Sequence, residues 1–316
     1  MQIMKDGTHF NFMGITKIAA VFSILMVVIS LSSLFKQGLN LGIDFTGGTI
    51  IELSYQDEAK LDNIRTTLKN GGFDGAAVQN FGSIRDVLVH LPVMPSKNMA
   101  DLSNEVVTVL QNESELPIDV RRVEFVGPQV GEELTEDGGL AMLYALIGIL
   151  IYVSFRFEYR FAIGSVIALV HDVIITLGVF SLFRLEFDLT VLAALLAVIG
   201  YSLNDTIVVF DRIRETFLRK RKGEPKEIVN NALNDTLSRT LMTSGTTLLV
   251  VFSLYWFGGT VIHDFAIALL LGIIIGTYSS IYIASTAVLA MGVSKADLMP
   301  PEKPEGEDIN EDGSQV

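Results

Sequence analysis

Six long runs of apolar residues divide the chain, and each is close in length to a membrane span. A helix needs roughly 20 such residues to cross the ~30 Å hydrocarbon core of a bilayer. The pattern therefore predicts a polytopic α-helical membrane protein with six transmembrane helices. The runs cover residues 18–35, 138–155, 161–183, 189–210, 240–262 and 265–293.

Basic residues in the connections predict the orientation, because Lys and Arg are enriched in cytoplasmic loops. Eight of the 23 Lys and Arg residues lie in the segment 211–239, whereas the connection after the third span holds only Arg184. We therefore expect the N-terminus (1–17), the basic loop 211–239 and the C-terminal tail (294–316) to lie in the cytoplasm. The spans from the second to the sixth form one bundle, residues 138–293.

The residues between the first two spans, 36–137, contain no membrane run and predict a small periplasmic α+β domain. Four β-rich or alternating segments are separated by two stretches with helical spacing. Their order, βαββαβ, is the split-βαβ, ferredoxin-like pattern. In chain order the segments are 43–55, 58–69, 77–81, 86–91, 97–111 and 118–126.

The composition narrows the possible functions. The net charge is −13 and there is no cysteine. An acidic chain lacks the cationic surface that nucleic acid requires, and the absence of cysteine excludes disulfides and thiolate metal ligands. The excess charge lies in the domain, with 17 acidic against 8 basic residues, and in the tail 294–316, with 7 against 2. The tail has no apolar periodicity, so we expect it to be disordered.

Asp205 falls inside the fourth span, where a charged side chain costs at least ~2.5–3.5 kcal/mol. Tyr201 lies one turn before it on the same face, and Asn204 adjoins it. One interpretation is a desolvated carboxylate that takes up and releases a proton. The other is a structural carboxylate paired with a basic residue, for which Arg239 at the start of the fifth span is the natural partner.

Arg239 also has an alternative role, since an Arg at a helix end commonly snorkels to the surface as an anchor. The residues that follow it form a Thr/Ser/Gly cluster that includes Thr243 and Ser244. Their hydroxyls suit a wet path through the membrane, but small residues also let helices pack closely. We favour packing as their larger contribution.

His171 and Asp172 lie in the middle of the third span. Adjacent residues point about 100° apart on a helix, so we expect that they do not both address one small site. At least one should face the bundle, where His171 either titrates near neutral pH or makes a polar contact between helices.

Enzymatic functions find no support in the sequence. There is no Gly-x-Ser-x-Gly motif, no Walker A motif and no His-Glu-x-x-His metal motif. Hydrolysis of ATP and metal-assisted hydrolysis therefore have no visible site. We expect neither catalytic residues nor a metal.

Four segments together resemble the SecF branch of the SecD/SecF family of bacterial protein-translocase subunits, within the resistance–nodulation–division (RND) superfamily. The first follows the first span and the second precedes the second span. The other two end the fourth span and begin the fifth. They are LGIDFTGG at 41–48, FVGPQVG at 125–131, GYSLNDTIVVFDRIRE at 200–215 and LSRT at 237–240.

This resemblance implies half of an RND-type assembly in the bacterial inner membrane. SecD would supply the other half, and the SecYEG translocon, YajC and YidC would be further partners in moving unfolded preprotein. The proton-motive force would drive late translocation and release at the periplasmic side. Asp205 would carry the proton with Arg239 as its charged partner, so protons would be the coupling ion and no cofactor would be needed.

The two glycine motifs flank the domain, where a hinge must flex, and Gly tolerates backbone angles closed to other residues. Tight turns at strand ends are the alternative, and both roles are compatible. The residues concerned are Gly42, Asp44, Gly47, Gly48, Gly127, Pro128 and Gly131.

Two other functions stay open. One is a small-molecule efflux subunit of the same superfamily, for which a single domain of this size is small. The other is a passive scaffold that only stabilises SecD.

Overall fold

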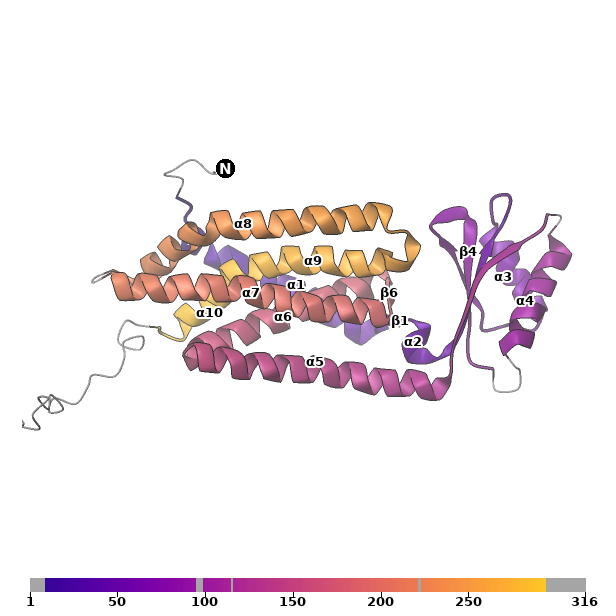
Figure 1. Ribbon diagram of the computed structural model, residues 1–316, viewed down its shortest axis with the longest axis horizontal. Coiled ribbons are helices and arrows are strands. Elements are labelled where there is room, and N and C mark those ends of the chain that lie inside the picture. Colours follow the sequence, from indigo (N-terminus) through magenta and orange to yellow (C-terminus); the bar gives the residue numbers. More distant parts are fainter. Residues whose placement is uncertain (1–8, 95–98, 115, 221–222, 294–316) are drawn as a thin grey trace, which may run out of the picture.

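The computed structural model describes residues 9–94, 99–114, 116–220 and 223–293, and it places a small α/β domain at one end of a bundle of long helices (Figure 1). In this described part, six helical stretches are long and apolar enough to cross a membrane, as predicted. They are α1 (Thr16–Gln37), α5 (Pro128–Arg156), α6 (Tyr159–Phe183), α7 (Leu189–Arg219), α8 (Pro225–Phe257) and a last span formed by α9 (His263–Ser279), the π-helical turn η3 (Ser280–Ala284) and α10 (Ser285–Ala290).

The second spanning helix begins at Pro128 rather than at residue 138, so its first turns lie within the segment 36–137 that was assigned to the domain. Gly127 is extended, and a proline at the first helical position has the φ angle that a helix needs. The apolar pattern did not predict these first turns because they contain several acidic residues. A hydropathy pattern detects apolar segments, and it does not detect a helix that is polar.

The expectation of a basic loop at 211–239 is wrong, because α7 and α8 extend into this segment from both sides. An apolar stripe is hidden among the charges. Ile213 and Phe217 of α7 belong to the same buried cluster as Ile228 and Leu233 of α8. Helix pairing in water needs only one apolar face, so the charged residues occupy the outer surface.

The turn between the last two spans also lies earlier than predicted. Helix α8 ends at Phe257, and Gly259 has a φ of 75°. This left-handed conformation favours glycine and reverses the chain. A short 3₁₀ turn, η2 (Thr260–Ile262), leads into α9.

The domain contains a four-stranded antiparallel sheet in the order β3-β4-β2-β5. The elements follow the predicted βαββαβ order, but the first strand starts late because Ile43–Thr46 form one helical turn, α2. The remaining elements are β2 (Gly48–Ser54), α3 (Leu61–Asn70), β3 (Ala77–Phe81), β4 (Ser83–Leu91), α4 (Met99–Glu113) and β5 (Asp119–Val126).

Alternating side chains give the sheet two apolar faces. Ile51 and Val89 belong to the core that the sheet forms with α3 and α4. Ile50 and Leu88 point to the opposite face and pack with Ile43 of α2. Helix α2 therefore lies between the sheet and the bundle, as Figure 1 shows.

The N-terminal residues 1–8 and the acidic tail 294–316 lie outside the described residues. The predictions for the tail therefore stay predictions.

Candidate functional site

Asp205 lies on the buried face of α7, with 7% of its surface exposed. Its Oδ1 accepts a hydrogen bond of 2.9 Å from Thr240 Oγ1 on α8. Its Oδ2 has no hydrogen-bond partner among the described residues. A proton can therefore bind at the free oxygen while the bond from Thr240 remains.

A pair of hydroxyls lies beside this carboxylate. Thr206 Oγ1 and Ser280 Oγ are 2.8 Å apart and both are buried, and Ser280 also neighbours Asp205. Ser280 is the first residue of η3, where the last span widens into a π turn. Single π turns inside α-helices are frequent at functional sites.

Asp172 forms a second polar centre and joins three helices. Its side chain on α6 is 1% exposed, and its Oδ2 accepts hydrogen bonds from Ser202 Oγ of α7 at 2.6 Å and from Ser279 Oγ of α9 at 2.8 Å. A Cβ at Gly276 would lie 2.9 Å from Ser202 Cβ, so this glycine lets α9 approach α7 closely enough for the serines to meet the carboxylate.

The expectation that His171 and Asp172 cannot share one site is wrong. Nδ1 of His171 lies 2.9 Å from Oδ1 of Asp172, and both side chains are buried. The 100° rule describes where the Cβ atoms point, but the longer side chains bend around the helix until their polar ends meet.

Tyr201 and Ser244 form a third polar contact, between α7 and α8. The Tyr201 hydroxyl donates to Ser244 Oγ over 3.3 Å, and Ser244 Oγ lies 2.8 Å from Thr277 Oγ1 on α9. Both predicted residues thus lie in the polar interior, one turn along their helices from the Asp205 centre.

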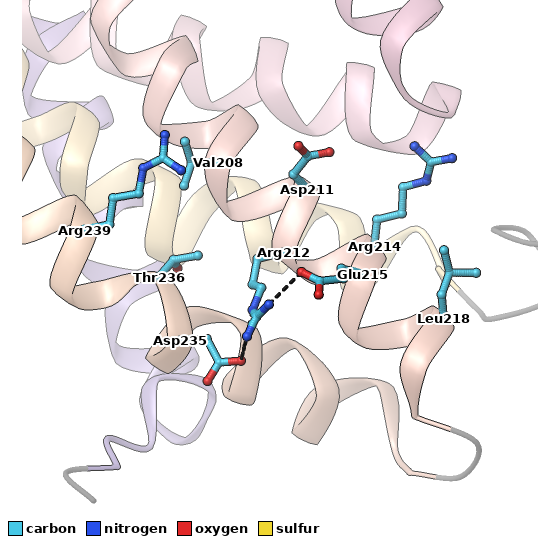
Figure 2. Close-up of a pocket in the computed structure, with 9 residues that line it drawn as sticks. All are labelled: Val208, Asp211, Arg212, Arg214, Glu215, Leu218, Asp235, Thr236 and Arg239. Atoms are coloured by element: carbon cyan, nitrogen blue, oxygen red, sulfur yellow. Dashed lines mark hydrogen bonds and ion pairs between the residues drawn. The ribbon is translucent and has the colours of Figure 1, made fainter. Parts of the chain in front are cut away.

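Arg239 is exposed and lines an open cavity of about 700 Å³ between the charged ends of α7 and α8. Figure 2 shows its guanidinium beside Val208, while Arg212 bridges Glu215 and Asp235 across the cavity. Within the described part of the chain, no ion pair joins Arg239 to Asp205, although its charge acts on that carboxylate. In this conformation Thr240, the next residue, makes the direct contact.

Two of the predicted site residues do not join the polar interior. Asn204 and Thr243 are both exposed on the outside of their helices. Thr243 donates its hydroxyl to the carbonyl of Arg239 in its own helix. Each lies about 100° around its helix from a buried neighbour, Asp205 or Ser244, so proximity in sequence does not bring it into the site.

The two glycine motifs that flank the domain pack directly against each other. A Cβ at Gly131 would lie 2.9 Å from the amide nitrogen of Gly47 and 3.0 Å from the carbonyl oxygen of Phe45. Gly47 and Gly48 have φ angles of 68° and 134°, which favour glycine and form the tight turn from α2 into β2. The motifs thus form a close backbone contact, and the hinge role stays a prediction.

Asp44 in the first of these motifs contacts the helix that carries Asp205. Its Oδ2 accepts a 3.0 Å hydrogen bond from the backbone nitrogen of Leu189, the first residue of α7. Asp188 caps the same helix by accepting from the nitrogen of Val191. Gly42 completes this junction by donating its amide to the carbonyl of Phe187.

Glu186 lies in the same junction, in a two-residue parallel pair between β1 (Asn40–Leu41) and β6 (Glu186–Phe187). Its Oε2 is 3.8 Å from His90 Nε2 of the domain sheet. Burial, followed by the negative charges of nearby aspartates, raises the pKa of Glu186 to about 7, and burial lowers the pKa of His90. The aspartates are Asp188, Asp264 and Asp44.

The sequence did not reveal the hydroxyls that surround the two carboxylates. Serine and threonine are ordinary residues of membrane helices, where they also serve packing. Only the spatial arrangement distinguishes those that bond a carboxylate. Thr240 opens the predicted Thr/Ser/Gly cluster, but its bond to Asp205 was not predicted. The other polar-interior hydroxyls, which were missed altogether, are those of Ser202, Thr206, Thr277, Ser279 and Ser280.

The described residues contain no group of three or more His, Cys, Asp or Glu side chains that is arranged to hold a metal ion. The site instead offers a buried carboxylate with a free oxygen, a buried His–Asp pair and a set of hydroxyls. Intramembrane carboxylates and histidines of this kind are the groups that carry protons in pumps and transporters. Fold and site together define a multi-pass membrane protein with a buried polar interior.

The chain belongs to the SecD/SecF family of protein export membrane proteins. The family model "Protein export membrane protein SecD/SecF, C-terminal" matches residues 105–294, and the "SecD/SecF GG Motif" matches residues 32–59. The protein translocase subunit SecF of Vibrio alginolyticus is 54% identical over 98% of this chain and 99% of its own length. The same subunit of Pseudomonas aeruginosa is 51% identical, over 95% of this chain and 96% of its own.

A solved structure is similar as well. The crystal structure of SecDF, a translocon-associated membrane protein from Thermus thermophilus, superimposes with a TM-score of 0.82 at 40% sequence identity. The match covers 91% of this chain, but the chain spans only 39% of that SecDF polypeptide.

Proposed function

We propose that this chain is a SecF-type subunit of the bacterial Sec export machinery. In the inner membrane it would work with SecD and use the proton-motive force to drive late preprotein translocation and release at the periplasmic side. The near full-length similarity to SecF subunits and the match to part of SecDF support this role.

One observation carries the proposal: Asp205 is buried between α7 and α8 with one bonded and one free oxygen. A carboxylate in this setting changes its charge when it takes up a proton. The change alters its interactions with Thr240 and with the positive charge of Arg239. Because Arg239 forms no ion pair with Asp205 within the described residues, its attraction to ionised Asp205 would favour a movement of α8 relative to α7.

The mechanical output would pass through α7 to the domain. Asp44 holds the far end of α7, and the glycine motifs hold the start of α5 against the same segment. A shift of α7 would therefore displace α2 and the start of α5, which connect the bundle to the sheet of the domain. Protonation in the bundle and movement of the domain are linked in this way.

The proposal also includes the orientation of the chain in the membrane and the classification of its α/β domain. The basic ends of α7 and α8 would face the cytoplasm with both termini, and the α/β domain would face the periplasm. The strand order β3-β4-β2-β5 with all pairs antiparallel supports a ferredoxin-like classification.

The proposed partners are SecD, the SecYEG translocon, YajC, YidC and the unfolded preprotein. The chain would act without catalysis and without a cofactor other than the coupling proton. Its charge of −13 does not suit nucleic acid.

The test is release of a secreted protein from vesicles that contain SecD, SecYEG and either this chain or its Asp205→Asn variant. A proton gradient should accelerate release with the unaltered chain, and D205N should abolish the acceleration. Asp211→Asn is the matched control, because Asp211 lies further along α7 and pairs with Arg156 on the surface. If D205N assembles with SecD and retains full gradient-dependent release, the proton role of Asp205 is wrong.

A further inference from the structure

Asp172 and Asp205 are held by neighbouring residues of the same two helices. In the last span, Ser279 donates to Asp172, and the next residue, Ser280, lies beside Asp205. On α7, Ser202 donates to Asp172 and lies one turn before Asp205. The two centres therefore share their supports, and a displacement at one must move groups that contact the other.

His171 offers a proton acceptor at the Asp172 centre. Its Nδ1 is 2.9 Å from Oδ1 of Asp172, and because an ionised carboxylate only accepts, we assign the hydrogen of this contact to Nδ1. The other ring nitrogen, Nε2, then carries a lone pair that can accept a proton. This nitrogen is buried, has no hydrogen-bond partner in the described part of the chain, and belongs to a residue that is 7% exposed.

The surroundings of the pair suit a positive charge on the imidazole. Two serine hydroxyls and the imidazole donate to Asp172, and such donors stabilise an ionised carboxylate. The His171 ring also stacks on Tyr278, with ring centroids 6.2 Å apart. An imidazolium here would be balanced by the adjacent carboxylate and would not be an isolated buried charge.

Helix α6 packs against α1, α5, α7 and the last span. The charged residues of α1 and α5 lie near the ends of those helices, away from the middle of α6. Within the described residues, Tyr278 of α9 stacks on His171, Tyr282 of η3 packs against Tyr278, and Ser23 of α1 bonds the Tyr278 hydroxyl. On α7, Asp205 lies one turn beyond Ser202, which bonds Asp172.

We propose that His171 is a second proton-binding group of the bundle, held by Asp172 and coupled through α7 and the last span to Asp205. The proton binds at Nε2 and is released from the same atom, so no covalent bond other than N–H forms or breaks. This inference rests on the proposed proton-driven function and extends it from one site to two. The serine pair at the π turn is the element that both sites contact.

The experiment follows the titration of His171 directly. The chain has four histidines, so selective isotope labelling of its imidazoles gives few magnetic resonance signals. The labelled chain is assembled with unlabelled SecD in lipid nanodiscs, and His171→Gln assigns the signal. We expect His171 to titrate within the range accessible to the complex. Asp205→Asn should change the pH dependence of this signal, as expected for two coupled sites.

Asp205→Glu keeps the charge and should restore the midpoint, while Asp211→Asn, a surface change on the same helix, should leave it unchanged. If D205N does not assemble, Thr206→Val removes the hydroxyl that bonds Ser280 and keeps both carboxylates. A His171 signal that does not titrate, or one that titrates identically in every assembled variant, overturns the inference.

The titration experiment and the release experiment test different claims, because the His171 signal is recorded without any protein export. A coupled His171 without a release defect in D205N would remove the export role of Asp205 but keep the second site. A release defect in D205N with an uncoupled His171 would do the reverse.

Discussion

The carboxylate of Asp44 accepts a hydrogen bond from the backbone amide of Leu189, over 3.0 Å. Asp44 follows the first span, and Leu189 begins α7, the helix that carries Asp205. The first amides of a helix lack partners inside the helix, and a carboxylate there also meets the positive end of the helix dipole. One aspartate thus connects the glycine motif near the domain with the helix of the buried carboxylate.

Replacing Asp44 by Ala should therefore weaken both stability and transmission. We expect the free energy of unfolding to fall by about 1 kcal/mol, as for other lost helix caps. Gradient-driven release should fall further than this small destabilisation explains. Thermal unfolding of the assembled complex and vesicle release measure the two effects. Asp44→Asn keeps an acceptor oxygen and should retain most of both, and the exposed Asp62→Ala serves as the control.

Thr240 should prove as important as the charged residue before it. Thr240→Val removes the hydroxyl that donates to Asp205 Oδ1. A hydrogen bond to a charged group contributes about 1.5–3 kcal/mol, so a loss of release by tenfold or more is expected. Thr240→Ser keeps the hydroxyl and should behave like the unaltered chain. Equal activity of T240V and T240S would show that this contact has no role.

Gly131 and Gly139 lie on the same helix and should respond oppositely to alanine. A Cβ at Gly131 meets backbone atoms of Gly47 and Phe45 at 2.9–3.1 Å, whereas a Cβ at Gly139 meets nothing within 4 Å. Gly131→Ala should lower the free energy of unfolding by about 1–3 kcal/mol through overpacking. Gly139→Ala should be neutral or stabilise by up to about 1 kcal/mol. Thermal unfolding in detergent compares them, and equal melting temperatures would contradict the close packing of the motifs.

Glu186 should make the junction less stable as the pH rises. Its folded pKa is about 7 against an ordinary 4.5, so the folded protein keeps a proton that the unfolded chain has lost. This stability is complete below the ordinary value and disappears as the pH passes through the folded one. Between pH 6.5 and 8.5 we expect a loss of about 1 kcal/mol.

Glu186→Gln should remove this dependence, whereas the exposed Glu58→Gln should retain it. The lowered pKa of His90 acts mainly below its ordinary value of 6.5, and its effect has the opposite sign, so it only reduces the loss near the lower end of this range. Unfolding measured at several pH values in one detergent provides the test. An identical slope in E186Q would show that another group causes the dependence.

Much of the fold was predictable because apolar runs and alternation are local properties of the chain. The six spans and the βαββαβ order both follow from them. The predicted helix ends were wrong where a helix continues from apolar into charged sequence without a break in its backbone conformation. Helix α5 includes acidic residues in its first turns, and α7 continues past Arg212 through further charged residues to Arg219. Hydropathy marks the edge of the membrane, whereas the end of a helix depends on caps and packing.

The site was predictable mainly in its ionisable members, together with Tyr201 and Ser244. Asp205, His171 and Asp172 stand out because ionisable residues are rare in apolar runs. Their hydroxyl partners come from other helices, and which serines reach them depends on the close approach of α9 to α7 at Gly276. Arg239 shows that the direction of a predicted side chain can also differ from the expectation. Its position near Asp205 was expected, but its long side chain turns to the open cavity, and sequence spacing does not determine that choice.

The uninterrupted course of α5 has a geometric consequence. A helix of 29 residues is a rod about 43 Å long, and its first residue adjoins the last strand of the domain sheet. If the opposite end is held in the bundle, a tilt of about 10° displaces the domain end by about 7 Å. A small tilt of α5 would therefore leave the helix packing of the bundle intact. At the end where the domain is attached, the same tilt would give a displacement larger than the pitch of a helical turn.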